Sequence, residues 1–230
     1  MTGSTPLLPQ VPAPLWLSLR VATLATLFIV ALGVPLALLL ARGRFPGKEL
    51  LGGLVTLPLV LPPTVLGYYL LHLLGRETWF GSWLERTWGV TIVFHWTGAV
   101  VASAVAAFPL FLLPARGAIE SVDPALEDAA RLLGRGEFSV FFAVTVPLAW
   151  RGLAAGAMLA FARALGDFGT TMMVAGNIPG VTQTASLAIY YANDIRDTRT
   201  ALILTLWLSS IAIAVLWVVQ RALPSKGLRP

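Results

Sequence analysis

The sequence contains no cysteine and few charged residues. With 0 Cys among 230 residues, disulfides, thiolate metal sites and cysteine nucleophiles are excluded. Only 12% of the residues are charged, whereas about a quarter is usual in a soluble domain. No Lys or Arg precedes Arg20, so the start of the chain does not match a secretory signal peptide, which opens with a positively charged region.

Long apolar runs dominate the chain instead. Hydrophobic residues make up 57% of it, and the mean hydropathy is +0.80. A helix needs roughly 20 apolar residues to cross the ~30 Å hydrocarbon core of a bilayer. Five runs meet this length and are predicted as spans: 17–41, 50–74, 90–113, 148–174 and 200–220. We therefore expect an all-α polytopic membrane protein, with residues 1–230 forming a single transmembrane domain.

The basic residues predict the orientation of the spans. Loops on the cytoplasmic side carry an excess of Lys and Arg. With the N-terminus outside and the C-terminus inside, the outer segments hold only Arg76, Arg86, Arg196 and Arg199. The inner segments then hold ten basic residues: Arg42, Arg44, Lys48, Arg116, Arg131, Arg135, Arg151, Arg221, Lys226 and Arg229. The net charge of +5 thus reflects topology, and we expect no nucleic-acid partner.

A polar stretch lies in the predicted cytoplasmic segment 115–147. Asp123 followed by Pro124 is typical of a helix start, and Gly134 is a suitable left-handed stop. Glu127 puts negative charge in an early turn, where the helix dipole favours it. The result is a short helix over 124–133, with a predicted apolar stripe of Leu126, Ala130 and Leu133. Such a helix is either a connector at the membrane surface or a docking helix for a soluble partner.

The residues of this segment resemble the loop motif of bacterial ABC-importer permeases. That motif has Glu-Ala-Ala, then Gly after three residues, and Ile-x-Leu-Pro nine residues later. At the same spacing this chain has Asp128-Ala129-Ala130, Gly134 and Val144-Thr145-Val146-Pro147. It departs from the motif in Asp for Glu, with Glu127 directly before it, and in Val for Ile and Leu.

Two further stretches are similar to the molybdate permeases, with sulfate permeases as relatives. These are LPLVLPPTVLGYYLLHLLG (57–75) and FARALGDFGTTMMVAGNIPG (161–180), where Asp167 stands in place of the usual Glu. The resemblance covers about 17–220.

The resemblance implies a function and a set of partners. It implies a homodimeric permease in the bacterial cytoplasmic membrane that imports molybdate by alternating access. A cytoplasmic ATPase dimer would use ATP and Mg, and a periplasmic or lipid-anchored protein would deliver the oxyanion. The chain itself would be no enzyme and bind no cofactor. Its ATPase-coupling residues would be Glu127, Asp128, Ala129, Ala130, Gly134 and Pro147.

The fourth predicted span combines a ridge of small residues with two charges. Gly152, Gly156, Ala160 and Ala164 recur every four residues, a spacing that lets helices approach closely in lipid. Arg163 and Asp167 fall on the same face and lie toward the outer side. Because a lone charge in a membrane is costly, they either pair structurally or form a gate at which Arg163 attracts an oxyanion.

The other candidates for the translocation pathway are Pro62, Pro63, Gly166 and Gly169, which lie at predicted breaks in the spans. Pro35 and the Pro62–Pro63 pair lie inside spans and predict kinks, because proline lacks a backbone donor. Gly166 and Gly169 flank Asp167, where a helix break suits a gate that bends.

Two stretches that could suggest a phosphate-binding loop or a metal site do not fit those patterns. GRFPGK (43–48) has the wrong spacing for a phosphate loop and is followed by Glu49. His72 and His95 have no carboxylate cluster beside them, so no metal site is expected. Tungstate, sulfate and thiosulfate remain alternative cargoes. An intramembrane enzyme built on Asp167 and a passive anion channel are alternatives from other classes.

Overall fold

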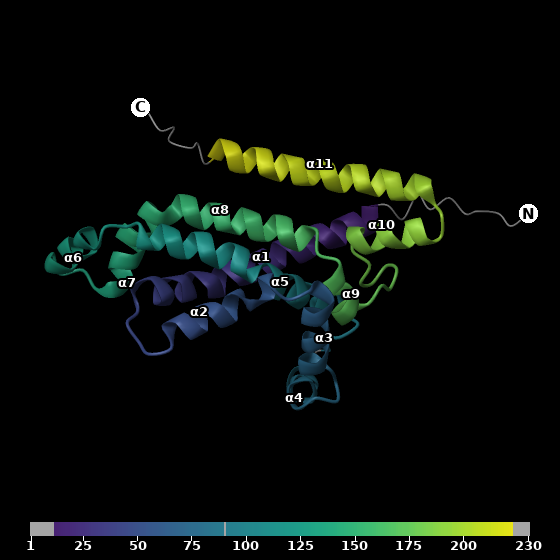
Figure 1. Ribbon diagram of the computed structural model, residues 1–230, viewed down its shortest axis with the longest axis horizontal. Helices are drawn as coiled ribbons and strands as arrows, with labels where there is room; N and C mark the ends of the chain where they lie inside the picture. Colours follow the sequence, from purple (N-terminus) through teal and green to yellow (C-terminus); the bar gives the residue numbers. More distant parts are fainter. Residues whose placement is uncertain (1–11, 90, 223–230) are drawn as a thin grey trace, which may run out of the picture.

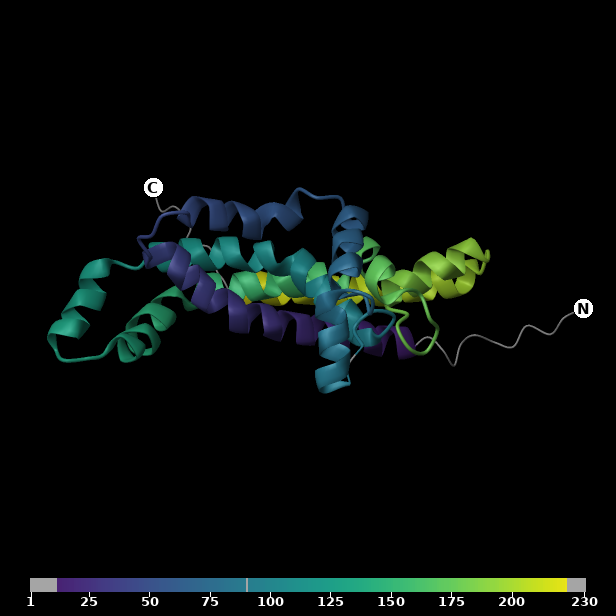
Figure 2. The ribbon, with the colours of Figure 1, turned by 90° about the horizontal axis from the view of Figure 1, so that it is seen from below.

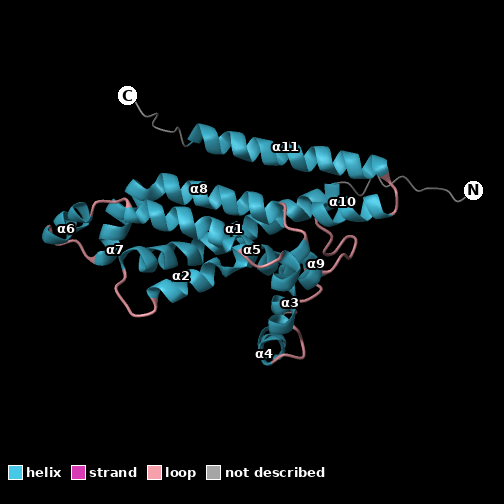
Figure 3. Ribbon diagram, viewed as in Figure 1, coloured by secondary structure: helices cyan, strands magenta, loops and turns pink. Residues whose placement is uncertain are grey.

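A computed structural model describes residues 12–89 and 91–222. Within these ranges every regular element is a helix (Figure 3). The elements in chain order are α1 (Pro12–Arg42), α2 (Lys48–Thr56), the 3₁₀ turn η2 (Leu57–Leu59), α3 (Pro63–Leu74), α4 (Trp79–Trp88), α5 (Trp96–Glu120), α6 (Pro124–Leu132), α7 (Glu137–Val140), the π-helical turn η3 (Phe141–Thr145), α8 (Val146–Leu165), α9 (Gly169–Ala175), α10 (Ala185–Asp194) and α11 (Thr198–Ala222).

Four helical stretches are long and apolar enough to cross a membrane. They are Pro12–Arg42, Trp96–Glu120, Glu137–Leu165 and Thr198–Val218. The bent pair Lys48–Leu59 and Pro63–Leu74 brings the number to five if it counts as one span. The prediction of an all-α polytopic membrane protein with about five membrane helices is therefore confirmed.

The second predicted span, 50–74, is not one kinked helix. The chain turns by 112° between α2–η2 and α3. Pro62 is the N-cap of α3 and Pro63 occupies its first turn. Neither residue has a backbone N–H to continue the hydrogen-bond ladder of the preceding helix, so the helix ends and a new one starts in another direction. Pro35, by contrast, stays within the continuous helix α1.

Two other predicted spans also have different limits. The span 90–113 begins only at Trp96, where His95 caps the helix, and continues to Glu120 through two internal prolines. The span 148–174 is divided, because α8 ends at Leu165 and α9 starts at Gly169. Apolar character continues through both regions, so hydropathy alone did not reveal these helix ends.

The core of the bundle is the packing of α5 between α1 and α8 (Figure 1). Phe111 of α5 is fully buried at its centre. A Cβ atom on Gly33 of α1 would collide with the Phe111 ring. A Cβ atom on Gly156 of α8 would lie 2.8 Å from the backbone oxygen of Phe111. Small residues on α1 and α8 thus allow the close approach that dispersion forces require in lipid.

The small-residue ridge of α8 lies on this interface. A Cβ atom on Gly152 would collide with the side chain of Ala118 on α5. Ala160 and Ala164 are buried in the same cluster as Phe111. The ridge therefore packs α8 against α5.

Different helices lie at the two ends of the bundle. α1 and α5 end, and α8 begins, at the end from which α6 and α7 project (Figure 2). At the other end lie α9, α10 and the start of α11, and α3 with α4 extends sideways from the bundle (Figure 1). Of the basic residues used to predict orientation, Lys226 and Arg229 lie outside the described residues.

Gly156→Ala should destabilise the protein by about 1–3 kcal/mol, the usual cost of overpacking, because the new methyl group would meet the backbone of α5. The matched control is Gly117→Ala, since a Cβ at Gly117 meets nothing within 4 Å. This change should be neutral or slightly stabilising, as alanine favours helix. Unfolding in detergent micelles measures both, and equal stability of the two variants would contradict the packing argument.

Candidate functional site

The polar segment, residues 121–145, connects α5 to α8 and contains α6, α7 and η3. Asp123 Oδ1 accepts a hydrogen bond of 2.9 Å from Ala125 N, which caps α6 as predicted. Gly134 has a φ of +81°. The Gly134 N–H donates to Arg131 O and the Arg135 N–H to Ala130 O, the pattern of a glycine-terminated helix. The observed helix ends within one residue of its predicted limit.

Arg131 joins α6 to α7. Its guanidinium donates to Asp128 at 2.7 Å and to both carboxylate oxygens of Glu137 at 2.7 and 3.1 Å. These hydrogen bonds, to Glu137 first and then Asp128, raise the pKa of Arg131 further above its ordinary value. The side chain therefore stays cationic, and its bidentate pair with Glu137 connects the two short helices.

Glu127 and its neighbour Asp128 have opposite environments. The Glu127 side chain is 4% exposed, whereas that of Asp128 is 67% exposed. Glu127 Oε1 accepts hydrogen bonds from Thr145 Oγ1 at 2.8 Å and from Arg42 Nη2 at 3.2 Å. The sequence indicated Glu127 but not its partners, because Arg42 is 85 residues away and no local pattern relates the two.

The predicted apolar stripe of α6 is not a buried face. Ala130 is buried, but Leu133 is 83% exposed. Leu132 and Phe138 are likewise 89% and 79% exposed. The leucines of the stripe are exposed because α6 projects beyond the bundle (Figure 2) and packs chiefly against α7 and η3.

The two remaining coupling candidates are also exposed, one in the polar segment and one just after it. Ala129 is exposed on α6, and Pro147 is exposed in the first turn of α8.

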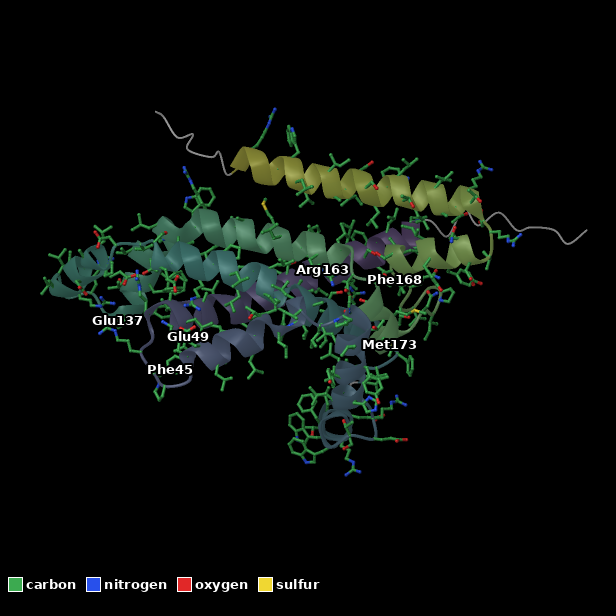
Figure 4. All side chains as sticks on the ribbon, in the orientation of Figure 1. Phe45, Glu49, Glu137, Arg163, Phe168 and Met173 are labelled. Carbon is green, nitrogen blue, oxygen red and sulfur yellow. The ribbon has the colours of Figure 1, made fainter. Side chains whose placement is uncertain are left out.

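Arg163 and Asp167 lie at the opposite end of α8 from the polar segment; Figure 4 shows Arg163 far from Glu137. Arg163 Nη1 donates to Asp167 Oδ1 at 2.9 Å. The other oxygen, Oδ2, accepts from the backbone N of Thr171 at 3.0 Å and from its hydroxyl at 2.7 Å. The Asp167 side chain is 1% exposed and that of Arg163 is 32% exposed. The carboxylate is therefore fully engaged, while the guanidinium keeps an accessible face.

The break between α8 and α9 lies beside the break between η2 and α3. A Cβ atom on Gly169 would lie 2.9 Å from Cβ of Pro63. Gly166 is the C-cap of α8, and Pro62 is the N-cap of α3. The structure thus brings Gly169 against Pro63, about 100 residues away in the sequence, and places Gly166 and Pro62 at the two helix ends that these breaks form.

His72 and His95 line one cavity of about 540 Å³ near α4. In the described part of the chain, no three His, Asp or Glu side chains are grouped so as to hold a metal ion.

A family model described as a binding-protein-dependent transport system inner membrane component matches residues 33–226. The chain belongs to this family. Among curated proteins it is 50% identical over 174 residues to the Molybdenum transport system permease protein ModB of Escherichia coli K12, covering 76% of each chain. It is 39% identical over 208 residues to the putative molybdenum transport system permease protein YvgM of Bacillus subtilis, covering 90% of this chain and 92% of the relative.

This inner membrane component also shares its fold with a solved transporter chain. A chain of the inward-facing MetNI methionine ABC transporter superposes with a TM-score of 0.73 over 96% of this chain and 98% of that chain, at 17% identity. The transport component is thus a multi-pass protein of the inner membrane, and its architecture is that of an ABC transporter chain.

Asp167→Asn should destabilise this membrane component by about 2 kcal/mol, because it leaves Arg163 without its charge partner. Breaking a buried pair costs more than this, but Arg163 is partly exposed. The double variant Asp167→Asn/Arg163→Gln should lose less than the sum of the two single changes. A double-mutant cycle by unfolding in micelles measures the interaction, and strict additivity would show that the pair contributes nothing.

Proposed function

We propose that the chain is the permease subunit of an ATP-driven importer of molybdate. The observation that carries this proposal is the 50% identity over 76% of the chain to a molybdenum transport permease. Membership of the family of binding-protein-dependent transport components, whose model matches residues 33–226, supports the transport role independently. Tungstate, sulfate and thiosulfate have the same tetrahedral anionic chemistry and are the competing cargoes.

The energy would come from a separate ATPase that docks on the polar segment. The chain's own glycine-rich stretch, GRFPGK, has neither the spacing nor the Ser or Thr of a phosphate loop. Leu132, Leu133 and Phe138 expose large apolar side chains on a segment outside the bundle, as a docking surface requires. A pair of ATPase subunits would use Mg and ATP there, beneath two copies of this permease.

The polar segment is proposed to face the cytoplasm. The basic residues Arg42, Arg116, Arg151 and Arg221 lie on helix ends that share one side of the bundle with α6. An excess of basic residues marks the cytoplasmic side. The binding protein, periplasmic or lipid-anchored, would then deliver the anion at the end formed by α9 and α10.

Arg163 is proposed to attract the anion near the outer gate. Its partly exposed guanidinium leaves donors free, while buried Asp167 balances its charge. Pro62, Pro63, Gly166 and Gly169 would allow α3 and α9 to shift at their junction, because both helices start there after a break.

Single cysteine substitutions test the orientation without background labelling, since the chain has 0 Cys. Asn193→Cys, at the end of α10, should react in intact cells with a membrane-impermeant maleimide. Ser139→Cys, in α7, should react only after permeabilisation. Both positions are exposed, so accessibility depends on the side of the membrane, and labelling of Ser139→Cys in intact cells would reverse the proposed orientation.

Reconstitution tests the transport function. Proteoliposomes with the permease, its ATPase and its binding protein should accumulate radioactive molybdate only with internal Mg-ATP. Excess tungstate should compete, because it matches molybdate in size and charge, and sulfate should compete less.

Controls distinguish the alternatives. Molybdate flux without ATP or ATPase would indicate a passive channel and contradict the proposal. ATP-driven uptake of sulfate in preference to molybdate would keep the importer and replace its cargo.

A further inference from the structure

One buried charged cluster at the polar-segment end is separate from the exposed apolar docking residues and from the gate. This cluster, called here the Glu127 node, consists of Glu127 of α6, Arg42 at the end of α1, Thr145 at the end of η3 and the carbonyl of Val122. Arg42 Nη2 donates to Val122 O at 2.7 Å as well as to Glu127 at 3.2 Å. One carboxylate therefore connects three segments that meet at the start of α6.

The node matters because α6 has little other contact with the bundle. Its packing is chiefly against α7 and η3. Between it and the end of α1 lies a cavity of about 460 Å³, lined by Pro35 and Leu38 of α1, by Glu127, Arg131 and Phe138 of the polar segment, and by Arg42 and Thr145. Across this space the side chains of the node, rather than close helix packing, hold α6 to α1.

The third segment of the node leads directly into α8. Thr145 is buried and ends η3, the π-helical turn Phe141–Thr145. π-helical turns occur mostly as single-turn bulges inside α-helices, frequently at functional sites. A hydrogen bond to the last residue of this turn therefore holds α6 at the point where the polar segment becomes a membrane helix.

We propose that Glu127 is the positioning residue that transmits movement of α6 to both α1 and α8. This inference rests on the proposed importer function and adds the route by which a push from the ATPase enters the membrane. Arg42 carries the movement to α1 and Thr145 carries it to α8. The chain connects α6 to α5 and, through α7 and η3, to α8, whereas the node adds a side-chain connection to α1.

The quantity that reports this role is the coupling ratio, the number of ATP molecules hydrolysed per molybdate transported. Loss of folded protein lowers hydrolysis and uptake together and leaves the ratio unchanged. A broken transmission lowers uptake while hydrolysis continues, so the ratio rises. The full complex of permease, ATPase and binding protein in proteoliposomes, supplied with molybdate, provides both rates.

Glu127→Ala should raise the coupling ratio about fivefold or more, the usual scale of an energetic coupling between sites. Glu120→Ala is the matched control, because Glu120 also pairs with an arginine, Arg116 at 2.7 Å, but within one helix and at an exposed position. Its ratio should match that of the unmodified complex.

A second pair of variants keeps the test independent of folding at Glu127. Thr145→Val preserves the shape of the side chain and removes its hydroxyl, so the ratio should rise. Thr145→Ser retains the hydroxyl and should restore the ratio. Unchanged ratios in Glu127→Ala and Thr145→Val, with normal ATP-driven uptake by the unmodified complex, would overturn this inference alone. Absence of ATP-driven uptake by the unmodified complex would overturn the proposed function as well.

Discussion

The close approach of α5 to α1 and α8 is the contact on which the rest of the structure depends. Lipid tails are as apolar as leucine, so burial alone does not drive membrane helices together. Here Phe111 fills the space between Gly33 and Gly156, and fully buried alanines continue the interface. Dispersion contacts at this distance hold the three helices, and the polar segment and the gate candidates are positioned at the two ends of this bundle.

The buried carboxylates of Glu127 and Asp167 lie in two clusters with different physical roles. At one end, Glu127 joins separate segments across a cavity. At the other, Asp167 is fully engaged by Arg163 and Thr171 within one short stretch of chain. Both carboxylates are buried and both are paired with an arginine, as the cost of an isolated charge in an apolar medium requires. The first cluster connects distant elements, and the second closes a local break between helices.

The helix breaks show which local signals could be interpreted without a structure. Gly134 was correctly predicted to end α6, because a glycine in the left-handed region stops a helix for reasons of backbone geometry alone. Proline was less informative. Pro35 remains inside α1, whereas Pro62 and Pro63 accompany a turn of 112°. The difference lies in the surroundings, since α3 turns to pack against α9, far along the chain.

The sequence by itself determined the class of the protein, the approximate number of membrane helices, the short helix with its caps and the family to which the chain belongs. All of these follow from apolar length, charge placement or local spacing, which are properties of neighbouring residues. Tertiary structure alone decided that Glu127 meets Arg42 and Thr145, that the leucines of the α6 stripe stay exposed, and that Pro63 lies beside Gly169. These pairings join residues up to about 100 positions apart, and only packing of the whole chain brings such residues together.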